Sequence, residues 1–234
     1  MFNILILFII IPLLMLAGLW TSRNTSQVKT VMVIGSSLLL ALSVYLVFDY
    51  IGLRKAGETA QMLYTSSFSW YGPLNICFSL GVDGISVVML LLSSIIVFTG
   101  TFASWKLKPM TKEYFLWYTL LTLGVYGFFI TVDMFTMFMF YEVALIPMYL
   151  LIGVWGTGRK EYSAMKLTLM LMGGSAFLML GLLGIYWHSA PEGAPLTWNI
   201  LEIAQNGAID RSWQMYLWYS SSSCILSCDG NLYG

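Results

Sequence analysis

The sequence predicts an all-α integral membrane protein with about six transmembrane helices. Only 9% of its 234 residues are charged, and the mean hydropathy is +0.80. The apolar residues gather in continuous runs, each near the ~20 residues that a helix needs to cross a bilayer. Continuous runs favour helices over a β-barrel, whose strands alternate in hydrophobicity over about ten residues. A formal net charge of zero gives no support to a nucleic-acid partner.

Six apolar runs are the predicted spans, and they cover residues 3–20, 30–48, 82–104, 114–132, 134–154 and 167–187. The first run has no basic segment before it and no convincing small-residue cleavage site, so we expect a retained helix and not a signal peptide. The segments 50–81 and 188–212 mix Gly, Pro, Ser and aromatic residues. We expect both to be extramembrane loops.

The basic residues of the loops predict the orientation. Three of them, Arg54, Lys55 and Arg211, fall in the loops after the even-numbered spans. The loops after the first, third and fifth spans carry the other eight, which are Arg23, Lys29, Lys106, Lys108, Lys112, Arg159, Lys160 and Lys166. Cytoplasmic loops are enriched in Lys and Arg. We therefore expect the N-terminus outside and the richer loops in the cytoplasm.

Glu142 is the leading candidate for a functional residue, because it lies near the centre of the predicted span 134–154. Insertion scales put the cost of a carboxylate at that depth at about 2.5–3.5 kcal/mol. Packing a lipid-facing helix does not require that cost, so we expect Glu142 to transfer protons. The alternative is a structural glutamate that is hydrogen-bonded to a neighbouring helix. Pro147 follows in the same span and removes the hydrogen bond to the Val143 carbonyl. Either water or a dry kink would then lie beside the acid.

Three further polar residues have simpler interpretations. Asp133 separates two spans that must form an antiparallel hairpin, and we expect a turn residue and helix N-cap at the outer surface. Lys166 begins the sixth span, where lysines usually anchor a helix at the interface. The alternative role for Lys166 is a cytoplasmic proton entry, or a distant cation that tunes Glu142. His188, at the outer interface, is expected to be solvated, with a proton relay as the alternative.

The sequence offers no site for a metal or a redox cofactor. Cys77, Cys224 and Cys228 lack the further Cys or His ligands of a metal site. A dinucleotide fingerprint and a haem motif are also missing from the sequence. If the protein serves a redox enzyme, we expect another chain to carry the electrons.

The segment 140–156 reads Phe-Tyr-Glu-Val-Ala-Leu-Ile-Pro-Met-Tyr-Leu-Leu-Ile-Gly-Val-Trp-Gly. It closely resembles the fifth helix of the subunit M family of proton-pumping NADH:quinone oxidoreductase, respiratory complex I. Residues 81–86 resemble the entry to the third helix of that family, and residues 159–166 its basic link into the sixth. The resemblance covers roughly residues 1–215. Multisubunit cation/proton antiporters share this ancestry and give the alternative function.

The resemblance implies a fourteen-helix antiporter-like fold with two inverted five-helix repeats. Residues 1–110 would form helices one to three with the outer loop 50–81, and residues 111–215 would start the first repeat. Glu142 would pair with a lysine of the seventh helix and move protons as electrons pass from NADH to quinone. Other membrane subunits would be partners, and NAD, FMN, iron–sulfur clusters and quinone would be bound by partner subunits. The location implied is the bacterial inner membrane.

The sequence departs from the family after residue 215. The segment 216–234 is rich in serine and lacks the lysine that the seventh helix of the family carries. We expect an aberrant, truncated or frame-shifted C-terminus, and a chain that is inactive alone. A non-functional fragment is therefore the third interpretation.

Overall fold

The structure is a computed structural model, and it describes residues 4–22, 24–57, 62–71, 76–106, 111–187 and 196–206. In these residues six helices are long and apolar enough to cross a membrane, which confirms the predicted fold class. They are α1 (Ile4–Thr21), α2 (Thr25–Lys55), α3 (Gly84–Ala103), α4 (Thr111–Ile130), α5 (Met134–Trp155) and α6 (Lys160–Trp187). Shorter elements are the strands β1 (Leu63–Tyr71) and β2 (Ile76–Val82), the 3-10 turn η2 (Ser104–Lys106) and the helix α7 (Ile200–Asn206).

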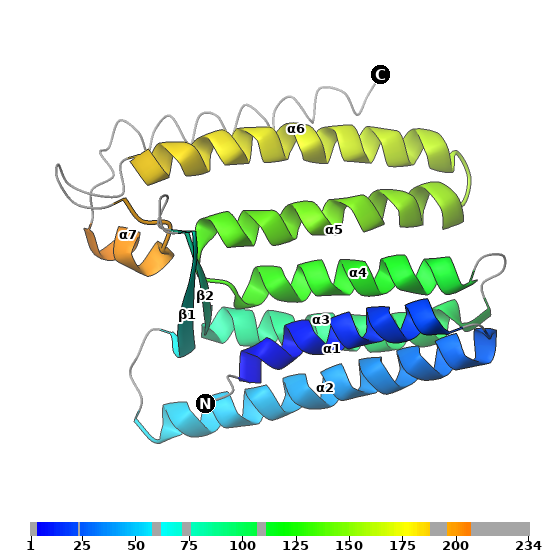
Figure 1. The fold of residues 1–234 in the computed structure, drawn as a ribbon, viewed down its shortest axis with the longest axis horizontal. Coiled ribbons are helices and arrows are strands. Elements are labelled where there is room, and N and C mark those ends of the chain that lie inside the picture. Colours follow the sequence, from blue (N-terminus) through cyan, green and yellow to red (C-terminus); the bar gives the residue numbers. More distant parts are fainter. Residues whose placement is uncertain are drawn as a thin grey trace.

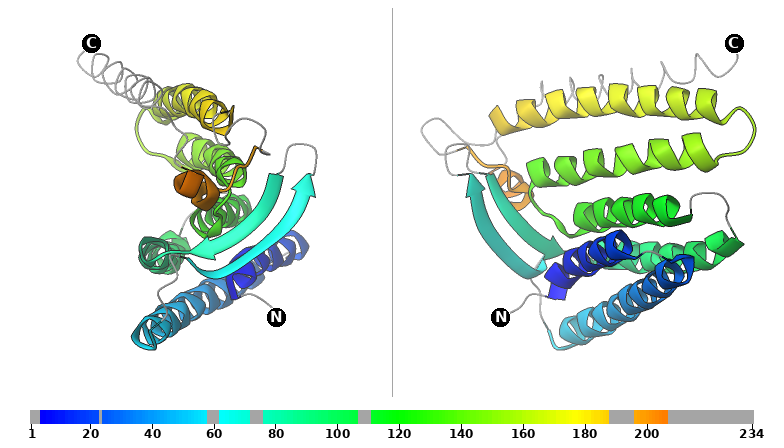
Figure 2. Two further views of the ribbon diagram at one scale, coloured as in Figure 1. Left: turned by 90° about the vertical axis from the view of Figure 1, so that its left-hand side faces the viewer. Right: turned by 45° about the vertical axis from the view of Figure 1, so that its right-hand side comes forward.

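The six long helices lie side by side, with α4, α5 and α6 in one row and α1, α2 and α3 grouped at the α4 side (Figures 1 and 2). Helix α5 packs between α4 and α6. The hairpin of β1 and β2 crosses one end of the row, close to α7 (Figure 1). The α5–α6 turn lies at the opposite end. This arrangement matters for the site, because the hairpin lies against the start of α5.

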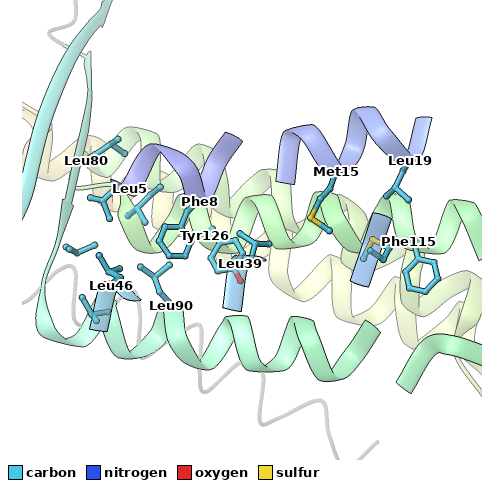
Figure 3. Packing of buried hydrophobic residues seen from close by; sticks show 14 of the residues in the cluster. Leu5, Phe8, Met15, Leu19, Leu39, Leu46, Leu80, Leu90, Phe115 and Tyr126 are labelled. Carbon is cyan, nitrogen blue, oxygen red and sulfur yellow. The ribbon is translucent and has the colours of Figure 1, made fainter. Parts of the chain in front are cut away.

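The larger cluster of buried hydrophobic side chains lies among α1, α2, α3, α4 and β2. Its fully buried side chains include Leu5, Phe8, Leu39, Leu46, Leu80, Leu90, Phe115 and Tyr126, most of which point toward one another in Figure 3. The Tyr126 hydroxyl lies 2.9 Å from Ser94 Oγ, so this core also satisfies its buried phenol. Helix α5 then packs closely on α4. A Cβ built on Gly124 would lie 2.9 Å from the Ala144 Cβ, so this crossing requires glycine.

Two parts of the fold differ from the prediction. Helix α2 has 31 residues and is longer than predicted, because it continues to Arg54 and Lys55 in its last turn. Such a helix is about 46 Å long, more than the ~30 Å hydrocarbon layer, so its charged ends reach past it. The predicted loop 50–81 instead contains the β1–β2 hairpin, with Phe68 opposite Phe78. The run of aromatic and Thr residues in β1 was a signal for a strand.

The described residues do not include every predicted feature. His188, Cys224, Cys228 and the expected aberrant tail 216–234 lie outside them.

Candidate functional site

The link between α4 and α5 sets the position of α5. The link is extended, and Thr131 forms a bridge with Leu80 of β2. On the side of the hairpin, the Val132 amide donates to the Ser79 carbonyl of β2 at 2.9 Å. On the other side the Val132 carbonyl accepts from the Ile200 amide at 3.3 Å, and the Trp198 carbonyl accepts from the Met134 amide at 3.1 Å. The link is therefore held between the hairpin and the segment that leads into α7.

Asp133 completes this junction. Its Oδ1 accepts a hydrogen bond from the Phe135 amide at 2.9 Å, which confirms the predicted N-cap of α5. Its Oδ2 accepts from the Cys77 amide of β2 at 3.2 Å. The expected surface position is wrong, because the residue is only 1% exposed beneath the hairpin. Burial raises the pKa of the Asp133 carboxyl, although the hydrogen bonds from backbone amides oppose the shift.

Glu142 lies about 12 Å along α5 from its start, near the middle of the helix as predicted. Its side chain is half-buried. The carboxylate oxygen Oε1 is buried and has no hydrogen-bond partner in the described part of the chain. Leaving a polar atom without a partner in an apolar environment is unfavourable by about 1–3 kcal/mol. The site is therefore incomplete until a donor reaches this oxygen.

The Glu142 side chain lies in an open groove of about 340 Å³ between α5 and α6. Three of the lining side chains carry a polar group, and they belong to Glu142, Tyr149 and Thr168. The apolar part of the lining consists of Met139, Val143, Leu145, Ile146 and Met172. Only 11% of the most apolar stretch of α5 and of α6 is buried, against 28–44% in α1–α4. The groove beside the acid is thus open and mostly apolar.

Pro147 is buried within α5, as its place in the predicted span implied. Because proline has no N–H, the helix cannot supply the usual donor to the Val143 carbonyl. Val143 also lines the groove. The region around Glu142 thus combines a carboxylate that lacks a donor within the described residues with a proline that removes one helix hydrogen bond.

Lys166 lies inside its helix and not at the start of it. Helix α6 begins almost two turns earlier, at Lys160. Lys166 is half-buried and precedes the groove residue Thr168 by two positions, but it is not among the residues that line the groove. The role of Lys166 therefore stays a prediction.

Tyr149 and Thr168 are site residues that the sequence analysis missed. A signal for Tyr149 was present, because a residue seven positions after Glu142 returns to the same face of a helix. Thr168 gave no such signal, since its place in the groove depends on how α6 packs against α5.

Comparison with known proteins identifies the class. Residues 131–221 match the family described as the transmembrane region of NADH:quinone oxidoreductase and Mrp antiporters. The fold resembles a chain in the structure of respiratory complex I from Thermus thermophilus with bound NADH. The TM-score is 0.75 and the identity 18%, over 92% of this chain and 42% of that chain. A chain of the archaeal membrane-bound sulfane sulfur reductase gives a TM-score of 0.69 at 22% identity, over 87% and 40%. The chain is a multi-pass membrane protein with the fold of an antiporter-like membrane-arm subunit.

The sequence is also similar to those of subunit M and of the chloroplast chain 4. It is 30% identical over 191 residues to the chloroplast NAD(P)H-quinone oxidoreductase chain 4 of Adiantum capillus-veneris. It is 28% identical over 203 residues to NADH-quinone oxidoreductase subunit M of Rickettsia conorii. These matches cover 80% and 86% of this chain, but only 38% and 40% of the two relatives. The chain thus spans about two fifths of the length of the relatives that it matches.

Proposed function

We propose that this chain forms part of a membrane-arm subunit of NADH:quinone oxidoreductase and translocates protons as electrons pass from NADH to quinone. Glu142 is the proton-transferring residue in this proposal. The observation that carries it is the half-buried carboxylate of Glu142 in the α5–α6 groove, with one buried oxygen that lacks a hydrogen-bond partner within the described residues. A carboxylate placed there is unfavourable unless it binds a proton or receives a donor.

The partner of Glu142 is expected to be a lysine ammonium from a helix that enters the groove. An ammonium group would donate to the unsatisfied oxygen and favour the ionised carboxylate. When that contact opens, the carboxylate loses a positive neighbour and takes up a proton more readily. Alternation between the two states would let Glu142 bind and release a proton. This step accounts for proton transfer at Glu142 alone. Translocation also requires a proton route from Glu142 to each side of the membrane.

The wider assembly is part of the same proposal. Other membrane subunits are the expected partners in the bilayer. We expect that this chain binds no redox cofactor, that NAD, FMN, iron–sulfur clusters and quinone belong to partner subunits, and that the chain alone does not pump. The basic residues support the α5–α6 turn in the cytoplasm and the N-terminus outside, and the proposed location is a bacterial inner membrane.

The names of the matched relatives favour the oxidoreductase over a cation/proton antiporter. The family description covers both kinds of protein, but the relatives described above are oxidoreductase subunits. Sodium or potassium transport that continues without NADH oxidation would instead favour the antiporter.

The test is the substitution Glu142→Gln in the complete complex, reconstituted into sealed vesicles. Gln keeps the size of the side chain but cannot bind and release a proton in this way. We expect electron transfer from NADH to quinone to continue in part, with fewer protons moved per electron. Glu161→Gln is the matched control, because Glu161 is exposed in the first turn of α6. Unchanged proton translocation in Glu142→Gln would remove the proposed role.

A further inference from the structure

A cation and an aromatic ring meet where the start of α2 lies near the end of α3, two helices that pack against each other. Lys29 lies about 6 Å along α2 from its first residue. Its Nζ is 4.9 Å from the centre of the Trp105 ring in η2. Lys29 is half-buried, and Trp105 is 39% exposed. The ring attracts the ammonium and holds it at the surface of the helix pair.

The Lys29 ammonium has no counter-charge in the described part of the chain. An ammonium group has three N–H donors, and no carboxylate of the described residues accepts from Lys29. The segments 20–29 and 104–113 contain five basic residues and one acidic residue, Glu113, which is exposed in the first turn of α4. This end of α1–α4 is therefore positively charged and attracts an anion from outside the chain.

An aromatic column leads from this cation toward the middle of the membrane. The Trp105 ring lies nearly parallel to the Phe102 ring, with their centres 6.0 Å apart. Phe102 contacts Phe98 edge-on, with ring centres 4.9 Å apart. Phe102 is 47% exposed and Phe98 is half-buried. The three rings cover about two turns along α3, so they form an apolar surface that begins beside the ammonium.

We propose that Lys29, held in place by Trp105, binds the phosphate of an anionic phospholipid, and that one acyl chain of this lipid lies along Phe102 and Phe98. The N–H groups of Lys29 donate to the phosphate oxygens. A zwitterionic lipid carries its own ammonium and brings no net negative charge, so the site prefers anionic lipids. The inference goes beyond the proposed function, because it concerns other helices than those that carry Glu142.

Lys160 is the matched lysine, because it has the same charge in different surroundings. The start of α6 lies at the same end of the molecule as the start of α2 and the end of α3 (Figure 1). Lys160 is also half-buried, but its Nζ donates to the Val154 carbonyl at 2.8 Å, and Glu161 follows it. A general attraction of basic residues to an anionic membrane acts on both lysines, whereas the lipid site requires only Lys29.

The test uses the complete complex in phosphatidylcholine vesicles that contain a photoactivatable phosphatidylglycerol, with the reactive group on an acyl chain. After irradiation, peptide mass spectrometry measures the labelling of residues 98–105. A photoactivatable phosphatidylcholine gives the zwitterionic comparison. The variants are Lys29→Gln, Lys29→Arg and the control Lys160→Gln, at equal accumulation of the complex. Unlabelled phosphatidylglycerol and inorganic phosphate are the two competitors.

Loss of one such contact is expected to weaken lipid binding by roughly 3- to 10-fold. We expect Lys29→Gln to need that much more phosphatidylglycerol for half-maximal labelling, with Lys29→Arg and Lys160→Gln near the parent. Unlabelled phosphatidylglycerol should compete, and inorganic phosphate should not. If Lys29→Gln fails to accumulate, Trp105→Leu decides, because it removes the ring that holds the ammonium and should weaken labelling by a similar factor.

Equal labelling of residues 98–105 in Lys29→Gln and the parent would overturn the proposal, as would equal labelling by the two lipids. The same loss in Lys160→Gln would show a general attraction only, and competition by phosphate would show a site for a free anion. Labelling by neither lipid would show that another subunit covers this face of α3. Each of these results overturns the lipid site and leaves the role of Glu142 unaffected.

Discussion

Substitution of Asp133 by Ala is expected to loosen the junction between the hairpin and α5. The change removes the acceptor of the Phe135 amide, and loss of a helix N-cap costs about 1 kcal/mol. It also leaves the Cys77 amide without its acceptor, at a further cost of about 1 kcal/mol. Removal of the buried carboxyl also removes its desolvation cost, which partly offsets these losses. We therefore expect a net destabilisation of about 1–2 kcal/mol at this junction.

Amide hydrogen exchange in lipid nanodiscs measures this effect at the two affected amides. A loss of about 1–2 kcal/mol corresponds to roughly 5- to 30-fold faster exchange of the Phe135 and Cys77 amides. Asp133→Asn is the intermediate variant, because its side-chain oxygen can still cap α5 while its NH2 group cannot accept from Cys77. Unchanged protection at both amides in Asp133→Ala would refute the assignment of Asp133 as a clamp.

The same residue predicts the direction of a pH dependence. Since burial raises the pKa of the Asp133 carboxyl, the folded protein holds this proton more tightly than the unfolded chain does. The stability from this difference is fully present below the unfolded pKa of about 3.9, and it is lost as pH rises through the folded pKa. As pH falls, the parent should therefore gain stability relative to Asp133→Asn. A gain of the Asn variant over the parent would contradict this sign.

Three substitutions test the packing of α4 against its neighbours. Lys112→Met removes the ammonium that donates to two carbonyls at the end of α1, at 2.9 and 2.7 Å, and should lower stability by about 1–2 kcal/mol in thermal unfolding. Gly124→Val places a side chain against Ala144 and should cost about 1–3 kcal/mol or prevent accumulation, whereas Gly52→Val, with nothing near its Cβ, should accumulate as the parent does. Ser94→Ala leaves the buried Tyr126 hydroxyl without its partner and should cost about 1–3 kcal/mol, while the double variant with Tyr126→Phe should recover part of that loss.

The sequence was sufficient for those features that depend on local composition. The apolar runs predicted the six spans, and Glu142 was recognised because a charge at that depth is costly. Asp133 was recognised as a cap because its position before an apolar run is local information. Its burial could not be predicted, since the covering amide of Cys77 lies 56 residues earlier in the chain. A contact between such distant segments cannot be recognised from the sequence next to either residue.

The errors at the helix ends have a different cause. Apolar runs report where a helix crosses hydrocarbon, but charged residues can continue the same helix beyond it. This is why α6 begins at Lys160 and not near Lys166, and why α2 includes Arg54 and Lys55. The groove depends on the side of α6 that meets α5. Thr168 could therefore be assigned only from the structure.

The hydrogen bonds that hold the start of α5 determine where this helix can bend. Backbone hydrogen bonds on both sides of Val132 hold the first residues of α5 in a fixed position. The opposite end leads into a turn, where Gly156 and Gly158 separate α5 from α6, and Gly158 has a φ of 76°. A displacement of the turn end would therefore bend α5 at Pro147, because the proline interrupts the hydrogen bonds that stiffen the helix. Glu142, on the fixed side of that break, would keep its place while Tyr149 moved.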